Sequence, residues 1–243
     1  MTRSLRVRCA AHNAVVNGRG TGYHIVVESA ARALIVAADA LGAWETGWEL
    51  AAAFVAEVGH RITPARLDEL DADAVAAVCS EAYRAAALEV DGEQLSERIG
   101  AAALLVGPRG AELFWAGAFK LFLIRDHRVA AETAAHVRAE ERVGAMSRRA
   151  AYQPDPHHPE LATRTRGLQH PIAMELDRLA APWQLAAGDA LVLGNEHTWQ
   201  QLEDTDLVTC AEAGRPPHDA ASRVYQFAAV VTVGPSGTTS TRC

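Results

Sequence analysis

One segment in the first quarter of the chain strongly limits how the chain can fold. Residues 33–38 (Ala-Leu-Ile-Val-Ala-Ala) form a short apolar run that predicts a buried strand. Asp39 follows directly, and a turn containing Gly42 leads into residues 44–60, where apolar side chains recur at helical spacing. A buried strand that ends on a carboxylate and turns into a helix places that carboxylate at the edge of a sheet.

The other apolar and turn-forming segments predict a mixed chain of helices and strands. A second helical stretch begins at the N-cap signal Thr63-Pro64 and is expected to break near residues 71–73. Four short strands joined by Gly-containing and Asp-His turns follow it. Helices gathered around antiparallel strands predict a layered α+β sandwich. The predicted strands are residues 5–9, 23–28, 33–38, 102–106, 113–116, 120–124, 128–131, 190–194 and 228–233.

Length and composition fit one globular domain. The chain has 243 residues, of which 49% are hydrophobic and 22% are charged, as is ordinary for a folded domain of this size. We expect a single domain over residues 1–234. The tail at 235–243 is rich in Ser and Thr, and we expect it to be flexible.

The charge and the cysteines narrow the possible partners and location. A net charge of −7 argues against binding to nucleic acid or to an anionic membrane. The first residues lack the apolar region of a signal peptide, and no apolar run approaches the roughly 18 residues that a membrane span needs. We therefore expect a cytoplasmic protein with free thiols. The four scattered cysteines are Cys9, Cys79, Cys210 and Cys243.

The order and spacing of several motifs resemble those of the metal-dependent protein phosphatases, the PPM or type 2C family. Residues 38–43 (Ala-Asp-Ala-Leu-Gly-Ala), followed by Gly47, resemble the family's D-G-M-G-G-x-x-x-G element. Residues 115–126 resemble the V-G-D-S-R-x-Y-L-x-R hairpin without a gap. Residues 188–196 resemble G-D-x-L-L-L-x-S-D-G. The family's T-x-D-H survives only as Thr133 and His136. Together these motifs cover most of the chain.

The resemblance implies a four-layer α-β-β-α sandwich with two central antiparallel sheets and a two-cation site at one end of them. In the family the cations turn a bridging water into hydroxide and clamp the phosphoryl oxygens. Of the four positions that should hold metal here, only Asp39 is acidic, because His24, Asn195 and Gln226 occupy the others. One carboxylate is too weak a cage for hard cations. We therefore expect no bound metal, no cofactor and no phosphoester hydrolysis.

Several neighbours of these positions are also candidate ligand-binding residues. Arg19 stands where the family has a phosphate-binding arginine, and His197 would line the same cleft. Glu196 would enter only after a one-residue slip, although adjacent side chains at a strand end point to opposite faces. Trp44 and Trp48 lie four residues apart, so they are either core aromatics or the floor of an apolar pocket.

Two functions of different classes fit these substitutions. In the first, the chain is a pseudophosphatase that binds and regulates a protein partner. In the second, it is a metal-free enzyme or small-molecule-binding protein of bacterial specialised metabolism. His24 and Asp39 would then carry acid–base chemistry. The ligand would contact Arg19, Asn195, Glu196, His197, Gln226 and Trp44. An active serine/threonine phosphatase is the least favoured function.

The two functions predict different surroundings for Asp39. An open cleft lined by His24, Asp39 and Asn195 favours the metal-free enzyme, whereas a cleft filled by Trp44 or Phe119 favours the interaction domain. A purely structural alternative also stands. In it, Asp39 caps the helix that begins near residue 44, and His24 is an ordinary strand residue.

Overall fold

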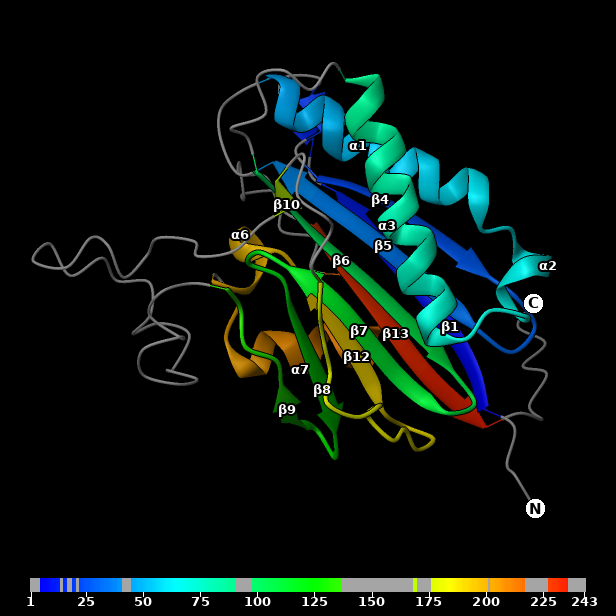
Figure 1. Ribbon diagram of the computed structural model, residues 1–243. Coiled ribbons are helices and arrows are strands. Elements are labelled where there is room, and N and C mark those ends of the chain that lie inside the picture. Colours follow the sequence, from blue (N-terminus) through cyan, green and yellow to red (C-terminus); the bar gives the residue numbers. More distant parts are fainter. Residues whose placement is uncertain are drawn as a thin grey trace, which may run out of the picture.

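Two antiparallel sheets stack face to face (Figure 1). The computed structural model describes residues 5–13, 15–16, 19–20, 22–40, 45–90, 98–136, 168–169, 176–200, 202–216 and 227–235. The first sheet has the strand order β1 (Leu5–Asn13), β13 (Phe227–Pro235), β12 (Ala190–Gly194), β8 (Lys120–Arg125) and β9 (Arg128–Glu132).

The second sheet carries the segment that ends on Asp39. Its order is β11 (Asp177–Arg178), β7 (Gly110–Ala116), β6 (Arg98–Gly107), β5 (Ala33–Ala40) and β4 (Gly22–Glu28), with β10 (Leu168–Gln169) also paired to β6. A separate two-stranded ribbon joins β2 (Val15–Val16) and β3 (Arg19–Gly20). Because β5 lies inside the sheet, both of its edges are hydrogen-bonded and its side chains are buried.

Helices cover the outer faces of both sheets. α1 (Glu45–Arg61) and α3 (Ala72–Glu89) pack on the second sheet, whereas α6 (Glu196–Trp199) and α7 (Asp204–Ala213) pack on the first (Figure 1). The predicted four-layer α-β-β-α sandwich is thereby confirmed. Within the described chain, no helix is both long and apolar enough to cross a membrane.

Side-chain caps set the helix boundaries between α1 and α3. The Thr63 hydroxyl accepts a hydrogen bond from Arg66 N and begins the short helix α2 (Pro64–Leu67). The Asp71 carboxylate accepts from Ala74 N and begins α3. Each cap satisfies an amide that has no partner within its helix, so the predicted break near residues 71–73 is observed.

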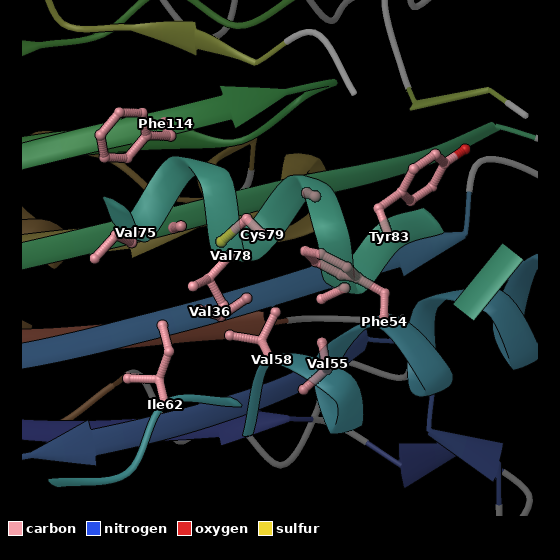
Figure 2. Packing of buried hydrophobic residues seen from close by; sticks show 14 of the residues in the cluster. Val36, Phe54, Val55, Val58, Ile62, Val75, Val78, Cys79, Tyr83 and Phe114 are labelled. Atoms are coloured by element: carbon pink, nitrogen blue, oxygen red, sulfur yellow. The ribbon is translucent and has the colours of Figure 1, made fainter. Parts of the chain in front are cut away.

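Three apolar layers hold the sandwich together. The first lies between the second sheet and α1 and α3, where Val36, Phe54 and Tyr83 meet (Figure 2). The second lies between the sheets. The third lies under α7 and includes Phe122 and Trp199. Each face of a sheet is thus buried by a different partner, which is why β5 and β12 are apolar on both sides.

The predicted strands are all present; the strand at 190–194 has the predicted ends, and the others differ at one or both ends. β1 was predicted to end at residue 9 but continues to Asn13, because it pairs with β13 along its whole length. β6 likewise begins before the predicted residue 102, since it follows β5 to its end. Long-range pairing, which a local sequence pattern does not contain, decides where these strands stop.

Candidate functional site

Asp39 lies near the end of β5 between glycines on both neighbouring strands. It pairs with Gly22 on β4 and with Gly100 on β6, and its side chain is only 5% exposed. A Cβ atom at Gly100 would lie 2.5 Å from Asp39 Oδ1, closer than two such atoms can approach. Glycine at position 100 therefore makes the room in which the carboxylate sits.

Asn195 contacts Asp39 from the other sheet. Its Nδ2 donates a hydrogen bond to Asp39 Oδ2 at 3.3 Å. Its Oδ1 accepts from Phe227 N at 3.1 Å and from Thr198 N at 3.3 Å, while the Thr198 hydroxyl donates to Phe227 O at 2.7 Å. Backbone N–H groups can only donate, so the oxygen of the amide must face them. The NH₂ group consequently faces Asp39, and this orientation follows from chemistry.

This orientation is incompatible with a cation held between Asp39 and Asn195. An amide coordinates a hard cation through its oxygen, and that oxygen is turned away from Asp39 and already accepts two backbone hydrogen bonds. The described residues contain no group of three or more His, Cys, Asp or Glu arranged to hold a metal. The residues present at this position do not fit the two-cation centre that the resemblance implies.

Phe119 occupies space beside Asp39. The side chain is fully buried, and its Cε2 atom would lie 3.3 Å from a Cβ atom at Gly100. Its ring packs edge-on against Phe227, with 6.2 Å between the centroids. The Phe119 ring and the Asp39 carboxylate therefore both adjoin Gly100.

His24 stands at the rim of the same region. It pairs with Ala37, and alternation along β5 puts Ala37 and Asp39 on one face of the sheet. Diagonal neighbours of this kind lie about 7–8 Å apart. The imidazole packs against Phe227 with 5.4 Å between ring centroids and is partly exposed on the outermost strand of its sheet. The structure thus brings His24, Asp39 and Asn195 together from three distant parts of the chain.

The other candidate residues are placed differently or lie outside the described part. Glu196 is the first residue of α6, and its buried carboxylate accepts a hydrogen bond from Gln200 Nε2 at 2.8 Å. The backbones of Arg19 and His197 lie in β3 and α6, but their side chains are not described. Trp44 and Gln226 lie outside the described residues. The turn through which Asp39 would cap α1 lies outside them too.

The hairpin core that differs from the family motif is buried throughout. Ala118 and Phe119 are apolar, and Lys120, although charged, is 0% exposed. The Lys120 ammonium lies 3.8 Å from Glu132 Oε1 and 4.8 Å from the centre of the Trp199 ring. An ion pair and a cation–π contact compensate the buried charge. This lysine belongs to the core between β8 and α6.

A contact between His136 and Asp177, which the sequence did not reveal, joins two separate segments of the chain. His136 Nδ1 accepts from Gly117 N at 3.0 Å, so its proton resides on Nε2, which lies 2.8 Å from Asp177 Oδ2. The ring stacks on Trp115 at 5.7 Å and is almost fully buried. His136 therefore has a structural role, because the two nitrogens of its ring link the end of β7 to β11. No local signal marks Asp177, because it lies 41 residues further along the chain.

No protein-family model matches the chain, and no curated protein matches it. Solved structures do. The serine/threonine phosphatase of S. agalactiae is 14% identical, with a TM-score of 0.67, over 93% of this chain and 99% of that one. The PPM Ser-Thr phosphatase MsPP from Mycobacterium smegmatis, in complex with cacodylate, is 17% identical, with a TM-score of 0.67, over 95% and 98%. The Mycobacterium tuberculosis serine/threonine phosphatase PstP/Ppp is 16% identical, with a TM-score of 0.65, over 95% and 99%.

Proposed function

We propose that this chain, which has the fold of the PPM-type serine/threonine phosphatases, is a binding or regulatory domain without phosphatase activity. The observation that carries the proposal is the orientation of the Asn195 amide, which offers hydrogen atoms to Asp39 where a cation would need oxygens. The N–H dipole takes over part of the charge compensation that a metal ion would supply.

Phosphoester hydrolysis by two cations needs several carboxylates, because each hard cation must have its charge offset by oxygen ligands. Asp39 contributes one. The His24 imidazole is a poor ligand for such cations, and the Glu196 carboxylate is hydrogen-bonded to Gln200 along α6. Phe119 takes up room beside Asp39. These features support a domain that recognises a protein partner.

A second candidate function is a metal-free enzyme or a small-molecule-binding protein of bacterial metabolism. His24 favours it, because histidine is the commonest general acid or base and this imidazole lies beside Phe227 and diagonal to Asp39. Arg19 would then anchor an anionic group such as a carboxylate or a phosphate. Activity should vary between about pH 5 and 8, the range in which histidine changes charge. We rank this function second because the Asn195 amide and the Phe119 ring occupy space beside Asp39.

The cellular location is part of the proposal. We place the protein in the cytoplasm, and the support is that Cys9, Cys79 and Cys210 are free thiols. Neither nucleic acid nor a membrane is proposed as a partner, in line with the net charge of −7.

Calorimetry with Mn²⁺ and Mg²⁺, together with hydrolysis of p-nitrophenyl phosphate, tests the proposal. We expect no tight metal binding and no turnover above buffer. The triple variant His24→Asp, Asn195→Asp, Gln226→Asp should gain Mn²⁺ affinity while remaining folded. A tight Mn²⁺ site in the natural protein that Asp39→Ala abolishes would refute the proposal. Loss of a measured small-molecule affinity in His24→Ala would favour the second function instead.

A further inference from the structure

A cavity lies at the opposite end of the first sheet from Asn195. It has a volume of about 390 Å³ and lies between the turn that joins β8 to β9, the turn that precedes β12, and the end of α7. β12 begins just after Asp189 and ends just before Asn195, so the two residues lie about 20 Å apart along the strand. The cavity is therefore separate from the region around Asp39, and nothing below depends on the function proposed for that region.

An ion pair builds one wall of the cavity. Arg125 donates from Nε and Nη2 to the two carboxylate oxygens of Asp189, at 2.9 and 2.6 Å. Asp189 also accepts from Ala186 N at 2.7 Å, and Arg125 Nη2 donates to Gln184 O at 2.9 Å. Burial alone would raise the pKa of Asp189, but these hydrogen bonds outweigh it and lower the pKa. The two charges cancel, so this wall is rigid and electrically neutral.

The remaining charged side chains of the cavity are mainly acidic. Asp126 is exposed, and its charge acts on the Arg125 guanidinium. Glu212 lies 2.6 Å from His127 Nδ1. Three carboxylates, those of Asp126, Asp189 and Glu212, thus line the cavity together with the one guanidinium of Arg125. The lining of the cavity therefore favours a cationic ligand.

The turn at the cavity rim places an acidic residue in the cavity lining. Asp126 and His127 have φ values of 51° and 57°, the only positive values at non-glycine positions in the described chain. A two-residue hairpin turn of this kind is best formed by Asn-Gly. Aspartate adopts positive φ more readily than most residues, so the turn accommodates Asp126, which lines the cavity.

The rest of the lining consists of small apolar groups. Ala186, Ala187, Ala190 and Ala211 surround the space together with Ile124. A ligand that suits both the acidic part and the apolar part of the lining has an aliphatic stem and a positive head, as lysine and arginine side chains do. Small-molecule sites occupy roughly 300–1,000 Å³. A volume of about 390 Å³ is at the small end of that range and suits one long side chain with its flanking backbone.

We infer that this cavity binds a lysine or arginine side chain of a partner protein, with the stem on the alanines and the head between Asp126 and Glu212. The net charge of −7 favours approach of a basic partner as well. The cavity would hold such a partner at the end of the sandwich away from Asp39, so both ends remain able to bind.

Titration of the ¹⁵N-labelled protein with the peptide Ac-Ala-Ala-Arg-Ala-Ala-NH₂ tests the inference. Its amide resonances at Ala187, Gly188 and Ala211 should shift, whereas the same peptide with neutral citrulline should leave them in place. Asp126→Asn and Glu212→Gln should each weaken binding by about fivefold, as expected for a partly exposed charge pair. Glu69→Gln removes the same charge from an exposed turn outside the cavity and should leave affinity unchanged.

Asp126→Asn keeps the turn intact, because asparagine readily adopts positive φ, so a loss of binding in this variant is not a loss of fold. A melting curve like that of the natural protein verifies this. Equal shifts with the arginine and citrulline peptides, or undiminished binding by Asp126→Asn, would overturn the inference. Binding of free argininamide as tight as that of the peptide would overturn the assignment to a protein partner.

Discussion

The Asn195→Asp substitution preserves the shape of the side chain and changes the atom that faces Asp39. One oxygen would still accept from Phe227 N and Thr198 N, as Oδ1 does now. The other would replace Nδ2, which lies 3.3 Å from Asp39 Oδ2. Two carboxylates would then meet in a region where Asp39 is 5% exposed. The folded state should lose stability.

The size of this loss follows from the distance. Two like charges 3.3 Å apart repel by about 5 kcal/mol at an effective dielectric constant of about 20. Protonating one carboxyl of ordinary pKa at pH 7.5 costs about 5 kcal/mol as well, so neither route avoids the penalty. Relaxation of the pair reduces it. We expect the free energy of unfolding to fall by about 3–5 kcal/mol at pH 7.5.

The pH dependence of the variant has a definite sign. Repulsion raises the pKa of the paired carboxyls in the folded state above the unfolded value of about 3.9. The folded variant then binds more protons than the unfolded chain, so its stability relative to the natural protein rises as pH falls from about 7 to about 4. Urea unfolding followed by circular dichroism at several pH values in this window measures the difference.

The double variant Asp39→Asn, Asn195→Asp is the matched control. It exchanges the two groups and restores one amide opposite one carboxylate, so it should recover most of the lost stability. An Asn195→Asp protein as stable as the natural one at pH 7.5, or a double variant with no recovery, would show that the amide does not face Asp39 as described.

Three further predictions concern other parts of the molecule. Gly100→Ala should lower the free energy of unfolding by about 3 kcal/mol in urea melts, because the new Cβ would lie 2.5 Å from Asp39 Oδ1; an unchanged midpoint would argue against this packing. Asp189→Asn should cost about 2 kcal/mol at neutral pH. Because the folded pKa of Asp189 is lowered, this difference between natural protein and variant should shrink as pH falls below about 4, and a constant difference would contradict the ion pair. The Cys79 thiol, whose pKa burial raises to about 12, should react with iodoacetamide at pH 8 only when urea unfolds the chain, as mass spectrometry of the labelled peptide would show.

Much of the fold could be predicted from the sequence because its local signals agree with the tertiary structure. Thr63 was recognisable as a cap, residues 71–73 as a helix break, and the apolar run before Asp39 as a buried strand. The strand predicted over residues 120–124, within the gapless hairpin motif, begins at Lys120 as predicted and ends one residue later, at Arg125. These features depend on neighbours within a few positions.

The surroundings of Asp39 were only partly predictable. The resemblance to the family motifs predicted that Asn195 lies near Asp39. The direction of its amide, however, depends on Thr198 and Phe227, which contact it because α6 and β13 pack together. Phe119 was recognised as a residue that could fill this space, and its position beside Gly100 depends on tertiary packing. His136 and Asp177 have no shared local pattern at all.

The hydrogen bond between Asn195 and Asp39 also bears on folding kinetics. It joins residues 156 positions apart and connects strands of different sheets. This contact requires the two sheets to be packed on each other, so it should form after each sheet has assembled, on the native side of the rate-limiting step. A contact that forms after the transition state changes the unfolding rate rather than the folding rate. The Asn195 amide should therefore act as a latch that sets how long the folded molecule lasts, with little influence on how fast it forms.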